Sequence, residues 1–351
     1  MSKAAELAAL IGSQTALSNR NLVINGAMQV AQRGTSTSSV TSTGIQTCDR
    51  YTFTPNNLGT WSVSQSSTAP SGFANSLKLE ATTADASPAA GDYALFLQKI
   101  EGQNLQQLKK GTASAESVTL SFWVRSSKIG TYIVELFDND NSRSISASYT
   151  ISSANTFEYK TLTFAGDTTG ALNNDNNTSL EVIWYLAAGS TYTSGTLQTS
   201  WGARTAANQA VGQVNMADTA NATWYITGVQ FEVGEQATPF EHRSFGDELN
   251  RCLRYYISET YAPSMQGSMN EANSRAAFAV PDIGYKKMRA APTFSLTNLS
   301  NGVHRPAVAF YTISSITSAS TDYLDLNMSG SLSGGVPLQL MSNRVIADSE
   351  L

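Results

Sequence analysis

The most constraining feature of this sequence is a series of short segments in which apolar and polar residues alternate. The clearest of them runs from Ser117 to Arg125. Its apolar side consists of Val118, Leu120, Phe122 and Val124. Because successive side chains of a β-strand point to opposite faces, such a segment predicts a strand with one buried face. Roughly ten such segments, joined by polar turns and with hardly any helical pattern, predict an all-β, antiparallel jelly-roll sandwich.

The stretch from Ala222 to Tyr256 marks the end of this sandwich. It begins with an apolar strand, in which Gly228 lies where a bulge would shift the alternation. A polar hook, Gly234–Arg243, follows, and Ser244 then provides the N-cap of a helix, with Asp247 in a capping-box position. The apolar face of that helix consists of Phe245, Leu249, Cys252, Leu253 and Tyr256. A strand that leads into a helix through such a corner predicts a boundary between modules.

The expected organisation has four parts along the chain. They are an N-terminal helical segment (1–20), the jelly-roll sandwich (21–243), a linker helix (244–262) and a smaller C-terminal β-sandwich-like domain (263–351). In the first part, Leu7 and Ile11 recur at helical spacing in a helix of about three turns, a length that is marginal alone. This helix therefore needs a partner, which is its own sandwich, copies of itself or a larger body.

The charge pattern excludes a nucleic-acid-binding surface. The chain has a formal net charge of -5 and no run of Lys or Arg, whereas nucleic-acid recognition needs a basic face. Charged residues make up only 14% of the chain, and polar uncharged residues replace them, as in many proteins that work outside cells. The sequence has neither a signal-peptide pattern nor about 20 consecutive apolar residues, so we expect no membrane insertion. Such a protein would leave the cell by lysis or within a particle.

Few residues offer catalytic or metal-binding chemistry. The two histidines, His242 and His304, are not spaced as metal ligands with cysteines or carboxylates. No motif of a nucleophile elbow, a phosphate-binding loop or a dinucleotide site occurs. Cys48 and Cys252 could form at most one disulfide, and their spacing leaves open whether they pair. We therefore expect no catalytic residue, no metal and no cofactor.

Acidic residues leave two alternatives open. The turn that contains Asp138 and Asp140 places oxygen atoms at alternate positions, as a calcium site would, but it lacks the glycine and glutamate of an EF-hand loop. Its residues are also common in hairpin turns, which is the interpretation we favour. Carboxylate pairs drawn from Glu135, Asp138, Asp140 and Asp175 could in principle hydrolyse a glycoside, although spacing does not show that any pair converges.

Aromatic residues are the better candidates for ligand contact. Trp184 and Trp224 are in phase with apolar neighbours, which predicts that both lie in the core. Trp123 is out of phase with the apolar residues of its strand and so points to the other face. Trp201 lies in a long polar loop and Asp175 in an asparagine-rich one, and long loops in compact domains are usually functional or disordered. The candidate ligand-binding residues are therefore Trp123, Trp201 and Asp175.

Four segments of the chain resemble a known family. They are NLVINGAMQVAQRGTS (21–36), CDRYTF (48–53), SFWVRSS (121–127) and TGVQFEVGEQATPFEHRSFGDELNRCLRYY (227–256). Over roughly 19–261 the chain resembles bacteriophage tail-fibre and related virion surface fibre proteins, whose shared module is similar to a carbohydrate-binding jelly roll. The last segment is the most specific of the four. The family's frequent Asp-Arg-Trp is Asp49-Arg50-Tyr51 here, a conservative aromatic change.

The resemblance implies a structural, non-enzymatic protein of a phage particle, a homotrimeric tail-fibre or spike-tip subunit that binds host surface glycan. Its N-terminal segment would attach it to other virion proteins. The residues expected to make subunit contacts are Leu7, Ile11, Leu249, Leu253 and Tyr256. A capsid or baseplate decoration fibre with a purely structural role is the alternative, and a surface-polysaccharide depolymerase is a third interpretation.

Overall fold

The structure is a computed structural model, and it divides the chain into two compact units, Met1–Glu248 and Leu249–Leu351. The residues it describes are 19–260, 265–270, 275–279, 288–289, 293–297, 303–305, 309–319, 323–329, 338–340 and 344–350. The expected N-terminal helix, with Leu7 and Ile11, lies outside the described residues.

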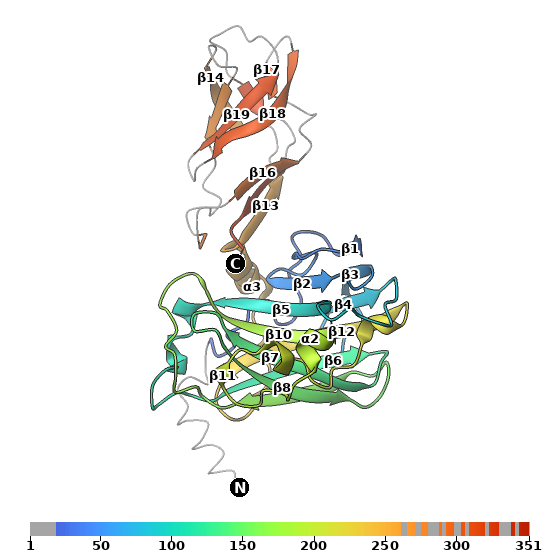
Figure 1. The fold of residues 1–351 in the computed structure, drawn as a ribbon. Helices are drawn as coiled ribbons and strands as arrows, with labels where there is room; N and C mark the ends of the chain where they lie inside the picture. Colours follow the sequence, from blue (N-terminus) through green and yellow to red (C-terminus); the bar gives the residue numbers. More distant parts are fainter. Residues whose placement is uncertain are drawn as a thin grey trace. The chain divides into compact units, whose positions relative to one another are not determined.

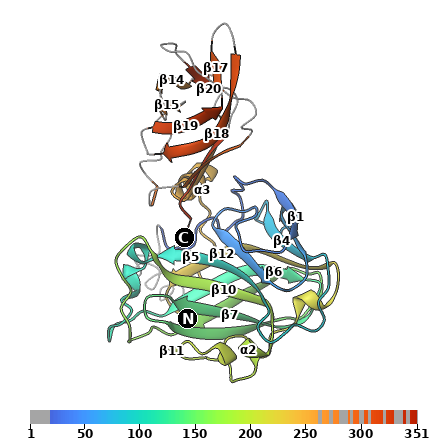
Figure 2. The same ribbon diagram turned by 45° about the horizontal axis from the view of Figure 1, so that its top comes forward.

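The first unit is a sandwich of two antiparallel sheets, as the alternating segments predict (Figures 1 and 2). Sheet A contains, in spatial order, β1 (Ser36–Val40), β3 (Trp61–Ser66), β4 (Ser76–Ala81), β12 (Ala222–Val233), β6 (Val118–Ser126) and β9 (Glu158–Phe164). Sheet B contains β11 (Gly202–Ala203), β8 (Arg143–Ile151), β7 (Gly130–Asp138), β10 (Thr178–Ala188), β5 (Tyr93–Glu101) and β2 (Tyr51–Asn56). The all-β jelly-roll fold class is therefore confirmed.

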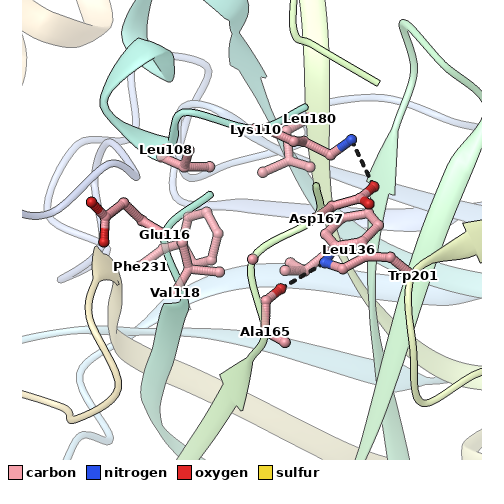
Figure 3. Close-up of a pocket in the computed structure, with 11 residues that line it drawn as sticks. Leu108, Lys110, Glu116, Val118, Leu136, Ala165, Asp167, Leu180, Trp201 and Phe231 are labelled. Carbon is pink, nitrogen blue, oxygen red and sulfur yellow. Dashed lines mark hydrogen bonds and ion pairs between the residues drawn. The ribbon is translucent and has the colours of Figure 1, made fainter. Parts of the chain in front are cut away.

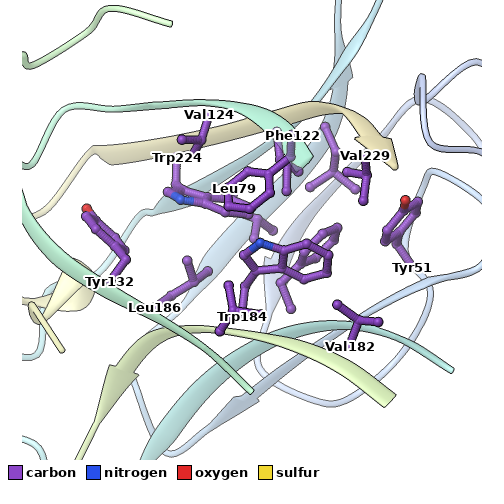
Figure 4. Close-up of a cluster of buried hydrophobic side chains, with 14 of the residues drawn as sticks. Tyr51, Leu79, Phe122, Val124, Tyr132, Val182, Trp184, Leu186, Trp224 and Val229 are labelled. Carbon is purple, nitrogen blue, oxygen red and sulfur yellow. The ribbon is translucent and has the colours of Figure 1, made fainter. Parts of the chain in front are cut away.

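Aromatic side chains from both sheets fill the space between them (Figure 4). Trp184 of β10 and Trp224 of β12 are both fully buried, as their phase predicts. The ring of Phe96 joins them, with centroids 5.7 Å from Trp184 and 5.5 Å from Trp224. Truncating an aromatic side chain of this kind to alanine costs about 3–5 kcal/mol. The core thus holds the two sheets together. It does not determine which side chains or segments lie on their outer faces.

A long segment covers the outer face of sheet B. We call residues 189–210 the strap; it includes α2 (Ser190–Thr193) and η4 (Ala206–Asn208), and Figure 1 shows α2 in front of β7 and β10. The apolar cluster beneath it consists of Leu97, Ile133, Ile183, Tyr185 and Ala210, with Tyr192 and Leu197 packed against them. A strand buried on both faces has a continuous apolar run, and β10 has one from Val182 to Ala187. That run is the signal in the sequence for a covered face.

Polar groups fasten the strap to the sheet. Arg204 of the strap donates two hydrogen bonds to the buried carboxylate of Glu135, at 2.9 and 2.8 Å. Tyr185 donates a third to the same carboxylate at 2.9 Å. The Arg204 guanidinium also lies 3.9 Å from the ring centroid of Phe137. Three donors offset the cost of burying Glu135, which is therefore held as part of the architecture.

The predicted bulge at Gly228 is present. The pairing of β12 with β6 shifts register between Thr227 and Gln230, and Gly228 has a φ of +61°, in the left-handed region that favours glycine. Ile226 before the bulge and Val229 after it both face the core. The extra residue thus keeps the apolar side of a twelve-residue strand buried along its length.

The hook Gly234–Arg243 holds the segment that precedes β1. The carboxylate of Glu241 accepts hydrogen bonds from the backbone N–H groups of Asn19 and Asn21, at 2.9 and 2.8 Å. Arg243 donates to the carbonyl oxygens of Asn21 and Val23. Two of the segments that carry the family resemblance therefore bind each other. Their residue types are explained by this contact, without any ligand.

The helix that follows the hook is shorter than predicted. It is α3 (Phe245–Leu253), and Ser244 caps it by accepting the Asp247 N–H at 3.1 Å, which confirms the predicted N-cap. The sequence predicted that the helix face reaches Tyr256, but Tyr256 begins strand β13 (Tyr256–Thr260). Aromatic and β-branched residues, Tyr255, Tyr256 and Ile257, follow the helix and favour a strand. The expected linker helix 244–262 is therefore wrong over its second half.

The second unit is also built from strands. Those of a three-stranded sheet are β13, β21 (Arg344–Asp348) and β16 (Thr293–Thr297). The others, β14 (Met265–Asn270), β15 (Arg275–Ala279), β19 (Tyr323–Ser329), β18 (Ala309–Ala319), β17 (Val303–Arg305) and β20 (Leu338–Leu340), close into a barrel. The sequence predicted a sandwich-like unit here; the closed barrel leaves its strands without a free edge.

The sequence leaves open whether the two cysteines pair. Cys48 and Cys252 are both buried, and neither is part of a disulfide. Burial raises the pKa of the Cys48 thiol to about 12. In the part of the chain that the structure describes, no helix combines the length and the apolar character needed to cross a membrane.

Candidate functional site

The outer face of sheet A carries aromatic side chains that are exposed or half-buried. Trp123 of β6 lies directly opposite Tyr159 of β9, and their ring centroids are 5.3 Å apart. Tyr159 is 45% exposed, so its ring is open to solvent. Both residues occupy the strand positions that alternate with core residues, which is why their rings face outward. The predicted orientation of Trp123 is therefore confirmed, while its role in ligand contact stays a prediction.

The row of rings continues from Trp123 across β12. A Cβ atom at Gly228 would lie 2.7 Å from the ring of Phe73 and 3.1 Å from that of Trp123, so both rings cover this glycine. The Phe73 ring centroid lies 5.0 Å from that of Phe240 in the hook. His242 lies 4.9 Å from Phe240 and 5.3 Å from Phe73, so these three rings form a triangle at the end of the row. We call Tyr159, Trp123, Phe73, Phe240 and His242 the aromatic strip.

A second group of side chains lies one row along the same face. Tyr225 of β12 is opposite Lys78 of β4 on one side and Arg125 of β6 on the other. The Arg125 guanidinium lies 4.8 Å from the Tyr225 ring centroid, and the Lys78 Nζ lies 6.0 Å from it. Phe157 meets the same ring edge-on at 6.2 Å. Aromatic and cationic groups therefore adjoin the aromatic strip.

Among the strip's five rings, sequence reasoning singled out only Trp123 as a candidate and missed the other four. Phe73 belongs to the loop between β3 and β4, and Phe240 and His242 belong to the hook. These segments are far apart in the sequence and have no strand periodicity, so no pattern predicts that they meet. Besides the phase of Trp123, the glycine at the Gly228 bulge is a sequence signal for this site, since a glycine in a strand often marks a close approach.

The arrangement suits a ligand with flat apolar surfaces and polar edges. The C–H faces of sugar rings pack on aromatic rings, while hydroxyl groups at their edges need hydrogen-bond partners. Beside the strip, β9 presents Thr161 and Thr163, which are both exposed residues, although the Thr163 hydroxyl already bonds to Thr119 and Glu235. The strip is an open surface, so it would bind an extended chain from one side.

Trp201 does not belong to the aromatic strip. Its indole N–H donates to the carbonyl oxygen of Ala165 at 2.7 Å, and the ring packs against the core of the sandwich. Trp201 lies beside a cavity of about 20 Å³ that is lined also by Lys110 and Asp167, and Figure 3 shows these side chains. Such a volume holds about one water molecule and no sugar. The structure therefore places Trp201 and Trp123 at separate sites.

A buried charge cluster lies beneath Trp201. Lys110 Nζ contacts Asp138 at 2.5 Å and Asp167 at 2.9 Å, and its side chain is only 4% exposed. Arg143 forms two hydrogen bonds with Asp167, at 2.8 and 3.0 Å. Burial opposes ionisation of Asp167, but the hydrogen bonds from Arg143 and Lys110 outweigh it and lower the pKa of this carboxyl. The cluster ties the loop after β9 to the turn between β7 and β8.

The acidic turn has the hydrogen bonds of a hairpin. Asp138 is ion-paired with Lys110 and accepts the Asn141 N–H at 3.0 Å. Asp140 accepts two hydrogen bonds from Asn173, both at 2.9 Å. These donors occupy the oxygen atoms that calcium would need. Within the described residues, no group of three His, Cys, Asp or Glu side chains could hold a metal ion.

The remaining acidic candidates are also engaged locally. Asp175 accepts hydrogen bonds from the backbone and side chain of Asn177, both at 2.9 Å, in a turn away from the aromatic strip. Glu135 lies under the strap, paired with Arg204. Hydrolysis of a glycoside needs two carboxyl groups that face one substrate bond, and these groups instead serve separate protein contacts.

By sequence, the chain matches no protein family and no curated protein. Among solved structures it is similar to the enzymatically active domain of tailspike protein 4 from bacteriophage CBA120, with 15% identity over 61% of this chain and a TM-score of 0.31. The chain spans 21% of the length of that structure. It is also similar to TmCBM61 in complex with β-1,4-galactotriose, with 8% identity over 62% of this chain and all of the other, at a TM-score of 0.30.

A third similar structure is the C-terminal family 22 carbohydrate-binding module of Clostridium thermocellum Xyn10B. It is 13% identical over 58% of this chain and 98% of the other, with a TM-score of 0.29. These neighbours are carbohydrate-binding modules and one phage tailspike domain. Scores this low decide nothing about ligands, so the candidate site is assigned from this chain's own residues.

Proposed function

We propose that this protein is a non-enzymatic subunit of a phage fibre or spike tip, and that its aromatic strip binds glycan on the host cell surface. The observation that carries the proposal is the row of aromatic rings on the outer face of sheet A. The strap covers the outer face of sheet B. The outer face of sheet A is therefore the face on which a ligand would meet several rings at once. The ion-paired states of Glu135 and Asp138 favour binding over hydrolysis.

The placement in a virion rests on the sequence resemblance, and the hook supports it. Glu241 and Arg243 fasten the backbone at Asn19–Val23, which is where the N-terminal segment joins the sandwich. A segment that attaches the protein to a particle needs such a fixed exit. We therefore propose that the N-terminal segment contacts other virion proteins and that the sandwich is displayed at the particle surface.

The proposed assembly is a homotrimer formed in part through α3. Phe245 at its start is 56% exposed, and Leu249 and Leu253 are half-buried. A surface strip without a deep pocket binds weakly, and three copies on one fibre raise the effective affinity by avidity. Mass measurement in solution tests this assembly. We expect the protein to be a trimer in solution and either Leu249→Asp or Leu253→Asp to dissociate it. A monomer at micromolar concentration would contradict this assembly.

Binding of host surface polysaccharide tests the role of the strip. Trp123→Ala is expected to weaken binding about 5- to 150-fold, since an aromatic ring that stacks a nucleic-acid base in an open site is worth about 1–3 kcal/mol and we expect a similar value for a sugar ring. The control is Ile129→Ala, which removes a 58% exposed apolar side chain outside the strip. Equal binding by both variants would show that the ligand does not contact Trp123. New reducing ends after incubation would instead indicate a depolymerase.

Deleting the gene separates receptor binding from decoration. Intact particles that fail to adsorb to the host are the expected result. Unstable particles would show that the protein is a structural component of the capsid or baseplate without a receptor role.

A further inference from the structure

Arg125 has an uncommon position beside the aromatic strip. It lies two residues from Trp123 on β6 and on the same face, so the two side chains start about 7 Å apart. Its Nε donates to the carbonyl oxygen of Asn155 at 2.9 Å, and its guanidinium lies 4.8 Å from the Tyr225 ring centroid. Two contacts thus hold the guanidinium in place, and neither is with a carboxylate.

The other charged groups near this face have protein partners, and one of them, the buried carboxylate of Glu232, accepts hydrogen bonds from Gln230 and Thr238. Lys78 contacts Glu80 at 2.6 Å, and Lys160 contacts Glu158 at 2.6 Å. Glu158 also accepts the backbone N–H groups of Ser152 and Ser153. Among the described residues, no carboxylate lies within ion-pair distance of Arg125. It therefore contributes a positive charge that forms no ion pair to the outer face of sheet A.

We propose that the ligand of the aromatic strip is a carboxylated glycan, a chain that contains uronic or related sugar acids, and that Arg125 binds its carboxylate. This inference rests on the proposed function of the strip. A guanidinium presents paired N–H groups that match the two oxygens of a carboxylate, and a hydrogen bond in which both partners are charged is stronger than a neutral one. Because Arg125 is already held by Asn155 and Tyr225, it loses little side-chain entropy on binding.

The geometry divides the ligand between two kinds of contact. The Trp123 and Tyr159 rings would stack on a sugar ring, and Arg125, one row along the sheet, would meet a carboxylate on that ring or on the next. The whole chain has a net charge of -5, so attraction of an acidic glycan comes from this local charge and weakens with added salt. Neutral glycans would use the rings alone and bind more weakly.

The experiment uses the full-length protein and a panel of uronate-containing oligosaccharides, each paired with its carboxyl-reduced form. Reduction converts the acid to a primary alcohol and leaves the sugar ring in place. Binding of at least one acidic member is expected, and reduction is expected to weaken it roughly ten- to a hundredfold. Arg125→Gln should cause a similar loss for the acidic form and little change for the reduced form.

Two controls keep the outcomes distinct. Lys109→Gln removes one positive charge from an exposed ion pair elsewhere, and its binding should equal that of the wild type. Equal affinity for acidic and reduced forms, unchanged by Arg125→Gln but lowered by Trp123→Ala, would overturn this inference and leave the proposed function standing. Binding of neither form, with host polysaccharide also unbound, would overturn both.

Discussion

Replacing Lys110 by methionine tests the buried charge cluster. The change keeps a long aliphatic side chain and removes the ammonium group that contacts Asp138 and Asp167. Asp167 retains two hydrogen bonds from Arg143, but Asp138, which is fully buried, loses its one ion-pair partner among the described residues. Removing one partner of a buried ion pair typically costs about 3–5 kcal/mol, because the other charge stays in a poorly solvating environment.

The neighbouring residue provides a matched control. Lys109 pairs with Glu116 at 2.6 Å, but the two side chains are 55% and 40% exposed. Exposed ion pairs contribute about 0–1 kcal/mol, so Lys109→Met should be nearly neutral. The two variants make the same chemical change one residue apart, but Lys110 is buried and contacts two carboxylates, whereas Lys109 is exposed and contacts one.

Tryptophan fluorescence during thermal unfolding is the assay. All five tryptophans lie in the unit Met1–Glu248, so the signal reports on the unit that contains the cluster. For a unit of this size, each kcal/mol shifts Tm by about 2–4 °C, so Lys110→Met should lower Tm by roughly 6–20 °C. Equal Tm values for the two variants would refute the claim that the cluster is buried and stabilising.

Three further predictions follow from the hook, the bulge and the core. Gly228→Ala should lower the free energy of unfolding by about 1–2 kcal/mol because the residue has a φ of +61°. The new Cβ atom would meet the ring of Trp123, so the variant should also alter the near-ultraviolet circular dichroism of Trp123. An unchanged spectrum would count against the aromatic strip. Burial opposes ionisation of Glu241, but the hydrogen bond from Asn21 and the charge of Arg243 outweigh it and lower the pKa of this carboxyl below the usual 4.5. The contribution of Glu241 to stability is therefore present above pH 4.5 and is lost as the pH falls through the lowered pKa. The stability difference between wild type and Glu241→Gln should accordingly shrink on acidification. A difference that is constant from pH 7 to pH 3 would be inconsistent with the hydrogen bonds that Glu241 accepts from Asn19 and Asn21. The Cys48 thiol, with a pKa of about 12 and no solvent exposure, should resist alkylation at pH 8 until the protein unfolds, as peptide mapping would show.

The fold was predictable where one strand alone carries the signal. Trp184 and Trp224 follow the alternation of their own strands, and both lie in the core. Gly228 and Ser244 likewise act within a few residues, as a bulge and an N-cap. The end of α3 was not predictable in the same way, because Tyr256 fits the helical spacing but pairs with Asp348 in a sheet. Tertiary pairing decided that position.

The candidate site was predictable only where a single strand carries the signal. Trp123 was assigned to the outer face from its phase alone, and the structure confirms that orientation. Phe73 and Phe240 reach the strip from a loop and from the hook, and no local pattern marks such a meeting. The role of Lys110 was equally hidden, since its partners Asp138 and Asp167 come from other segments. Burial of a charge depends on the whole fold, which spacing along the chain does not show.

Fluorine NMR of the protein labelled with 5-fluorotryptophan tests the central claim most directly. Its five tryptophans report on separate environments: three lie in the core, Trp201 beside the small cavity and Trp123 in the aromatic strip. On addition of the host polysaccharide, the resonance that Trp123→Phe removes is expected to shift, while the other four stay in place. A shift confined to Trp201, or bound polysaccharide with no shift at Trp123, would contradict glycan binding by the strip.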